Sequence, residues 1–126
     1  MGELVPVGQV RLCIDANDVA RIGEFWSALL GYEIHEDDLE DSWLHLDPPS
    51  PTFPPLTIQP VPEAKTGKNR LHLDIFVTDP EPWIERCLTL GGTLLWRGDG
   101  PSDEFQVIAD PEGNELCICT ISAPRA

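Results

Sequence analysis

The sequence is poor in basic residues and contains no long apolar run. Its 8 Lys and Arg residues stand against 22 Asp and Glu residues, which gives a formal net charge of −14 at pH 7. A field of this sign repels phosphate backbones and anionic lipid, so we expect neither nucleic acid nor a membrane as a partner. No segment reaches the roughly 18 consecutive apolar residues that indicate a membrane-spanning helix. The acidity is typical of a solvated surface, with attraction of cationic ligands as the alternative.

Signals for export and for a disulfide framework are also missing. The first residues, Met-Gly-Glu-Leu-Val-Pro, lack a basic region followed by an apolar segment, so we expect no secretory signal and a cytoplasmic location. The four cysteines include no C-x-x-C pair. In a reducing compartment we expect them to be mostly small buried apolar residues. No glycine-rich phosphate loop and no Ser-His-Asp spacing can be argued from the sequence either.

The sequence does contain an internal repeat. The segment 11–18 (RLCIDAND) recurs 61 positions later as 72–79 (HLDIFVTD), and each copy leads into a Trp-containing stretch that ends at glycine. A unit of this length is longer than a solenoid repeat and indicates two copies of a half-domain. We therefore predict a single domain over residues 1–126, with module one at about 9–61, a linker at 62–69 and module two at about 70–121.

Hydrophobic patterning predicts the same order of elements in both copies. Helices are expected at 18–31 and 79–92, each capped by Asp and closed by Gly. Alternating segments predict strands at 9–15, 32–35, 43–47, 56–59, 71–77, 93–96, 104–109 and 115–121. The fold class is therefore α+β, with two tandem βαβββ modules. We expect them to form a cup-shaped, eight-stranded, mostly antiparallel sheet with the helices outside.

The strand faces that do not meet the helices are unusually polar. Unpaired polar groups cost a few kcal/mol each in a dry core, so we expect these faces to line a ligand cavity between the module sheets. Trp43 would supply an aromatic wall and His45 a polar contact at the cavity edge. The predicted cavity residues are Arg11, Trp43, His45, Gln59, His72, Asp74 and Cys117.

Three motifs resemble the glyoxalase/bleomycin resistance/dioxygenase (vicinal oxygen chelate) superfamily, and its glyoxalase-like group in particular. They are Asp-x6-Phe-Trp followed by Leu-Gly-Tyr within 18–32, Asn-Arg-Leu-His-Leu-Asp at 69–74, and Asp-Pro-Glu-Gly-Asn-Glu-Leu-Cys at 110–117. The resemblance runs from about Val10 to Ile121. It implies paired βαβββ modules around a concave site. It also implies a homodimer, because relatives often complete the site through a second subunit.

The resemblance implies metal-ligand positions that this sequence fills only in part. The first-strand positions fall on Arg11 and His72, the last-strand Glu position falls on Cys117, and the fourth-strand counterpart is Gln59 or Thr57. A guanidinium stays protonated and cannot act as a ligand. We therefore predict that the standard divalent-metal centre is absent and that no cofactor is bound. The alternative is a softer zinc site that uses His72 and Cys117.

Each of these residues also has a structural interpretation. Arg11 would pair with Asp74 or Glu115 across the cavity, or its forked donors would bind a ligand carboxylate. His72 would hold the halves in register through hydrogen bonds, or it would contact the ligand. Cys117 would be inert packing, or a nucleophile if a neighbour lowered its pKa.

We predict a glyoxalase-like small-molecule-binding protein without metal chemistry. The alternative is a lyase, isomerase or dioxygenase-type enzyme of the same superfamily in which His72 is a metal ligand or the acid/base, making His72 the best candidate for a catalytic residue. A third alternative is a module that has lost its site and serves as a subunit. The sequence leaves open whether the protein is an enzyme.

Overall fold

The computed structural model describes residues 4–35, 43–97 and 105–121. The elements follow the order β-α-β-β-β twice. They are β1 (Leu12–Ala16), α1 (Val19–Leu30), β2 (Glu33–Ile34), β3 (Leu44–Asp47), β4 (Leu56–Pro60), β5 (Leu73–Val77), α2 (Pro80–Thr89), β6 (Thr93–Arg97), β7 (Phe105–Ala109) and β8 (Glu115–Thr120). Within these residues neither helix has the length and apolar character needed to cross a bilayer.

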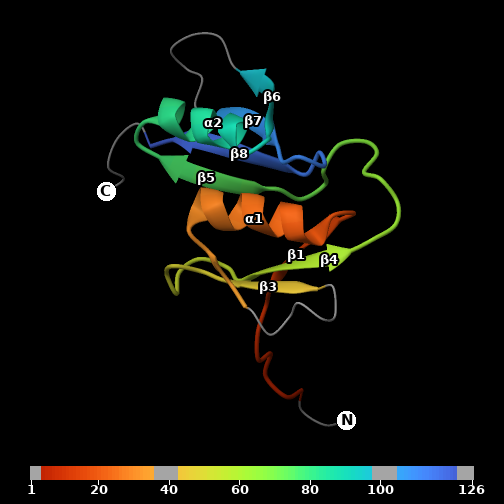
Figure 1. Ribbon diagram of the computed structural model, residues 1–126. Coiled ribbons are helices and arrows are strands. Elements are labelled where there is room, and N and C mark those ends of the chain that lie inside the picture. The colour runs from red at the N-terminus through yellow and green to blue at the C-terminus, as the bar shows by residue number, and fades with distance from the viewer. Residues whose placement is uncertain (1–3, 36–42, 98–104, 122–126) are drawn as a thin grey trace.

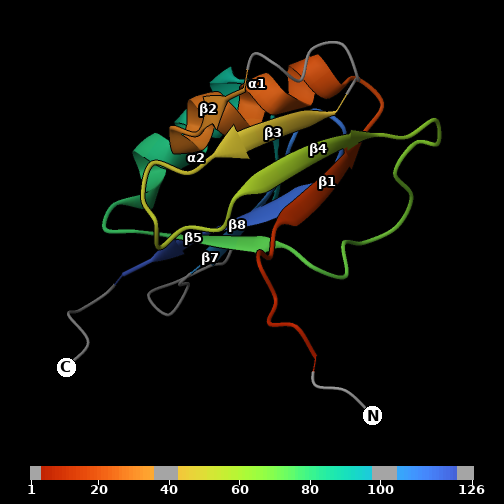
Figure 2. The same ribbon diagram turned by 90° about the horizontal axis from the view of Figure 1, so that it is seen from below.

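The strands form two separate four-stranded sheets, one for each module. Sheet A has the order β1-β4-β3-β2 and sheet B has the order β5-β8-β7-β6. The first and last strands of each module run parallel, and the remaining neighbours are antiparallel. Strand β1 lies at one edge of sheet A with β2 at the other, and β5 lies at one edge of sheet B with β6 at the other. Figure 2 shows β1 beside β4 and β5 beside β8.

Local sequence explains where both helices begin and where α1 ends, whereas α2 ends at Thr89 with Leu90 as its cap, one residue before the predicted glycine pair. Asp18 caps α1 by accepting a hydrogen bond from the backbone N–H of Arg21, and Gly31 ends the helix with a left-handed φ of 77°. Asp79 caps α2 in the same way through the N–H of Glu81. Pro80 follows at the first helical position, where its missing N–H has no partner to lose.

One hydrophobic core joins both modules, and α1 is at its centre. Leu44 and Ile58 of sheet A lie against α1 at Gly23. On another side of the helix, Phe25 approaches Gly92 of the second module. Figure 1 shows α1 on the side of sheet A that faces the second module, with α2 against sheet B. The alternation in β3 is confirmed, because Leu44 and Leu46 are buried in this core.

The predicted α+β fold of two βαβββ modules is confirmed. The structure adds two features that patterning did not supply. The eight strands are divided between two sheets that are not closed into one, and α1 contacts both modules instead of covering only its own sheet.

Candidate functional site

The face of sheet A that is turned away from the core is polar, and Arg11 belongs to it. The Arg11 guanidinium donates to Thr57 Oγ1 at 2.9 Å and to the carbonyl oxygen of Leu56 at 2.7 Å. The Cys13 thiol lies 3.4 Å from Gln59 Oε1 on the same face. Arg11 is thus held by its own module. The expected ion pair from Arg11 to Asp74 or Glu115 does not occur among the described residues.

Trp43 and His45 lie on β3 or at its start, beside this polar face. His45 pairs with Thr57 of β4 in the strand register and is half-buried, whereas Trp43 is exposed. The backbone of His45 also accepts a hydrogen bond from the N–H of His35. Four of the predicted site residues therefore lie on sheet A or directly before its strands: Arg11, Trp43, His45 and Gln59.

The other three predicted residues meet on sheet B. His72 Nε2 lies 3.0 Å from Asp74 Oδ1. Asp74 and Cys117 are direct partners on the adjacent parallel strands β5 and β8. The donor atoms of all three side chains fall within 4.8 Å of one another. Burial raises the pKa of the Cys117 thiol, and the negative charge and hydrogen bond of Asp74 raise it further. The thiol therefore stays protonated at neutral pH, which argues against an activated nucleophile.

Exposed aromatic side chains continue the same face of sheet B. Cys119 pairs with Phe76 on one side and with Phe105 on the other, so these side chains lie in a row across three strands. Trp96 stacks on Phe105 with the ring centroids 5.0 Å apart. Phe76, Trp96 and Phe105 remain 57%, 46% and 44% exposed. We call Phe76, Trp96 and Phe105 the aromatic shelf.

Phe105 and Trp96 are not among the cavity residues predicted from the sequence. Their alternation within β6 and β7 was visible, but their place beside Cys117 depends on the pairing of β6, β7 and β8. A break in register between Leu94 and Trp96 also changes which side chains of β6 lie opposite β7. A bulge of this kind re-aims side chains and is hard to foresee from one sequence.

Glu115 at the start of β8 fastens the linker to the second module. Glu115 is buried and forms an ion pair with Lys68, while Lys65 Nζ lies 3.6 Å from its other oxygen. The Lys68 ammonium, which donates a hydrogen bond to the carboxylate, holds the pKa of Glu115 below its usual value and outweighs the opposing effect of burial. The basic linker thus neutralises a carboxylate that would otherwise be buried without a partner.

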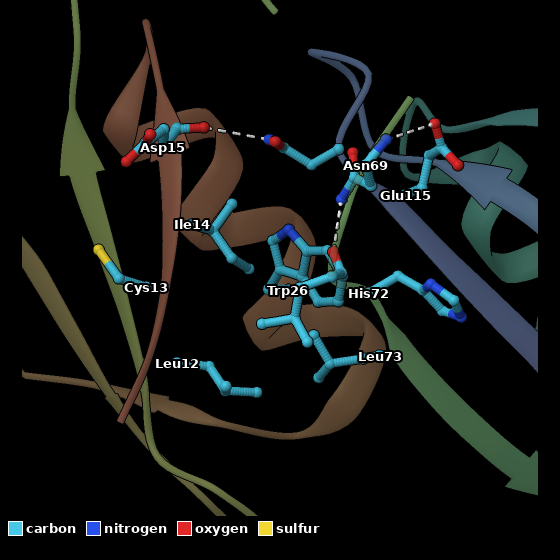
Figure 3. A pocket seen from close by; sticks show the side chains of 11 residues that line it. Leu12, Cys13, Ile14, Asp15, Trp26, Asn69, His72, Leu73 and Glu115 are labelled. Atoms are coloured by element: carbon cyan, nitrogen blue, oxygen red, sulfur yellow. Dashed lines mark hydrogen bonds between the residues drawn. The ribbon is translucent and has the colours of Figure 1, made fainter. Parts of the chain in front are cut away.

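A small pocket opens between the edge strands β1 and β5. Figure 3 shows Leu12 and Ile14 on one side, Leu73 on the other, and Trp26 of α1 between them. Its volume of about 190 Å³ is below the roughly 300–1,000 Å³ that is usual for a small-molecule site. Of the predicted cavity residues, only His72 lies at this pocket.

The seven predicted residues are thus divided between two surfaces. In Figure 3, Cys13 and His72 point away from each other on opposite sides of the pocket. Arg11 lies on the same side of the pocket as Cys13, because it donates a hydrogen bond to Thr57, the strand partner of Cys13. Among the described residues, the hydrogen bonds of Arg11 go to Thr57 and Leu56, and the ion pair of His72 goes to Asp74. A cavity that unites all seven residues stays a prediction.

The standard two-module metal centre does not fit this chain. Its first position is occupied by Arg11, whose guanidinium is bound to Thr57 and Leu56 and carries a fixed positive charge. The cluster on sheet B has a different composition, with one nitrogen, one oxygen and one sulfur donor from a single module.

Comparisons with known proteins agree with the two-module fold. The profile of the Glyoxalase-like domain family matches residues 11–119, which span both modules. The chain belongs to this family. No protein of curated function matches it by sequence.

Solved structures share the fold at low sequence identity. A glyoxalase/bleomycin resistance protein/dioxygenase family enzyme from Burkholderia phytofirmans is 16% identical, with a TM-score of 0.69 over 88% of this chain and 96% of that one. The fosfomycin resistance protein FosX from Listeria monocytogenes is 12% identical, with a TM-score of 0.70 over 92% of both chains. The trypanothione-dependent glyoxalase I of Leishmania major is 15% identical, with a TM-score of 0.64 over 91% of this chain and 87% of that one. At such identities the likeness establishes the fold alone.

Proposed function

We propose that this glyoxalase-like protein binds a small molecule on the face of sheet B and lacks the standard divalent-metal centre of its superfamily. The observation that carries the proposal is the combination on one face of the polar cluster His72, Asp74 and Cys117 with the aromatic shelf. Ligand sites typically pair apolar aromatic surface with a few convergent polar groups. Exposed aromatic side chains grouped in this way also mark interaction surfaces.

The chemistry of this face favours a flat, partly apolar ligand with a polar or cationic group. The ring of such a ligand would stack on Trp96 or Phe105, and its polar group would reach Asp74 or His72. A net charge of −14 raises the local concentration of cations and disfavours anions. This is why we propose a neutral or cationic ligand class.

The second candidate function is catalysis by the same face. The His72 imidazole lies against the Asp74 carboxylate at 3.0 Å, and a carboxylate orients an imidazole for proton transfer. This pair supports a lyase or isomerase activity that uses His72 as acid/base. The raised pKa of Cys117 argues against a thiolate mechanism.

A homodimer would complete the proposed site. The polar face of sheet A, with Arg11 and Cys13, is turned away from the core of its own chain. Facing sheet B of a second copy, it would enclose the ligand and exclude water from it. Analytical ultracentrifugation tests this part of the proposal independently of any ligand, because a monomer at all concentrations contradicts it.

A thermal-shift screen against hydrophobic and cationic small molecules, carried out in chelator, tests binding. We expect hits whose affinity falls about 2- to 10-fold in the Phe105→Ala variant, since an aromatic stacking contact contributes roughly 0.5–1.5 kcal/mol. Phe53→Ala is the matched control, because Phe53 is similarly exposed but lies in the proline-rich loop before β4.

A hit that weakens equally in both variants argues against the shelf as the binding surface. If no compound stabilises the protein, the binding proposal fails and the interpretation as a module without a site is favoured. Conversion of a hit to product, abolished in His72→Ala, would favour the enzyme over the binding protein.

A further inference from the structure

We propose that His72, Asp74 and Cys117 form a binding site for a soft divalent cation of the zinc class, contained entirely within the second module. This site differs from a centre whose ligands come from the first strands of both modules, because Arg11 takes no part in it. The proposed site has three ligands, because Asp74 joins the pair His72 and Cys117.

The pairing of β5 with β8 brings the three donors together, with His72 as the residue directly before β5. His72 precedes β5, and Asp74 lies two residues further on, so both side chains are on the same face. Cys117 is the register partner of Asp74 on the adjacent strand β8. Strands position ligands more rigidly than loops do, so the geometry is largely preformed.

The distances between the donor atoms suit tetrahedral coordination of an ion after small side-chain movements. Zinc binds sulfur at about 2.3 Å and nitrogen or oxygen at about 2.0–2.2 Å, so tetrahedral ligands lie roughly 3.3–3.7 Å apart. His72 Nε2 and Asp74 Oδ1 are 3.0 Å apart, and no pair of donor atoms exceeds 4.8 Å. His72 and Asp74 are exposed and can rotate, whereas Cys117 is buried and fixed.

The chemistry of the donors selects the class of ion. A thiolate with an imidazole and a carboxylate favours zinc or cobalt, whereas magnesium and calcium prefer oxygen ligands alone. Three protein ligands leave one tetrahedral position for water or a ligand atom. That position would lie on the same face as the aromatic shelf.

The local charge also favours a cation. Asp74 lies directly opposite Cys117 on the adjacent strand, and Glu115 is two residues before Cys117 on β8, so two carboxylates lie near the thiol. The opposing charge of Lys68 is partly neutralised by its ion pair with Glu115.

Cobalt titration of chelator-treated protein tests the site directly. We expect a thiolate-to-cobalt charge-transfer absorption in the near ultraviolet that zinc removes and magnesium does not. Cys117→Ser should abolish the band, and the matched control Cys119→Ser should keep it, because Cys119 lies on the same strand face outside the cluster. Asp74→Asn should weaken cobalt binding at least about tenfold, since even indirect supporting groups contribute about 10- to 100-fold.

A second measurement uses the unaltered chain and guards against variants that do not fold. Zinc should slow the alkylation of Cys117, as followed by peptide mass mapping, and leave the exposed Cys13 of the first module unaffected. Absence of the cobalt band, its survival in Cys117→Ser, or equal alkylation of Cys117 with and without zinc overturns the site. A ligand found in chelator while the cobalt band is absent overturns the metal site alone and leaves the binding proposal standing.

Discussion

Trp26 and Asp110 join the two modules through a buried hydrogen bond. The indole Nε1 of Trp26 in α1 donates to Asp110 Oδ2 at 3.0 Å, and the two residues are only 1% and 2% exposed. Asp110 Oδ1 also accepts from the backbone N–H groups of Glu112 and Asn114. One carboxylate thus shapes the turn before β8 and fixes α1 against the second module.

Replacing Asp110 by alanine should destabilise the protein by about 3 kcal/mol. The substitution leaves a buried indole N–H and two turn N–H groups without their acceptor, and such losses cost about 1–3 kcal/mol or more for bonds to charged groups. Urea denaturation followed by tryptophan fluorescence measures the change. Asp79→Ala, which removes an exposed helix cap, should cost only about 1 kcal/mol. Equal losses in the two variants would contradict the proposed role of Asp110.

The stabilising effect of Glu115 should disappear in acid. Because Lys68 lowers the pKa of Glu115 in the folded protein, the folded state binds the proton less tightly than the unfolded chain does. The stabilisation is therefore complete above the unfolded pKa of about 4.3 and is lost as the pH falls through the folded pKa. Glu115→Gln should be less stable than wild type at about pH 7, and the gap should close in acid.

Urea unfolding of both proteins across this pH range measures the gap. Glu85→Gln, on the exposed side of α2, serves as the control and should track wild type throughout. A gap between wild type and Glu115→Gln that stays constant down to acidic pH would show that the Glu115 carboxylate does not contribute through its ionisation.

Gly92 should tolerate no side chain. A Cβ at this position would lie 2.8 Å from the carbonyl oxygen of Ala109 and 2.9 Å from that of Cys87, and it would also press on Phe25 of α1. Backbone oxygens cannot move aside as a side-chain terminus can, so Gly92→Ala should cost about 1–3 kcal/mol. Gly8→Ala is the control, since nothing lies within 4 Å of its Cβ. Thermal unfolding of both variants tests this, and a neutral Gly92→Ala would refute the close approach.

The cysteines should react in a fixed order with an alkylating reagent. Burial raises the pKa of Cys87 to about 11, so its thiolate is scarce as well as inaccessible. Cys13 is exposed, although partial burial and Asp15 raise its pKa as well. Peptide mapping at about pH 8.5 should show Cys13 modified first and Cys87 only after unfolding. Early labelling of Cys87 would mean that α2 opens readily from sheet B.

Much of the fold follows from local sequence. The 61-residue repeat predicts two modules of the same element order, and Asp18, Asp79 and Gly31 act at the helix ends where patterning places them. The sequence also allows the grouping of His72, Asp74 and Cys117 to be predicted. Residues two apart on a strand share a face, and the first and last strands of a module are neighbours in this fold.

Other features of the site depend on pairing between distant segments. The stack of Trp96 on Phe105 needs the register of β6 and β7 and the bulge in β6. The ion pair of Lys68 with Glu115 joins residues 47 positions apart. Neither is encoded by a spacing that can be read along one strand or helix.

The sequence by itself determined the elements, their caps and the face to which each strand side chain belongs, because these depend on interactions between near neighbours in the chain. Only the tertiary structure decided how the two polar faces are oriented. Packing of α1 against both modules, through Trp26 and Phe25, sets the angle between the sheets, so that Cys13 and His72 point away from each other. That angle is a property of side chains fitting together across the whole core, and no local pattern records it.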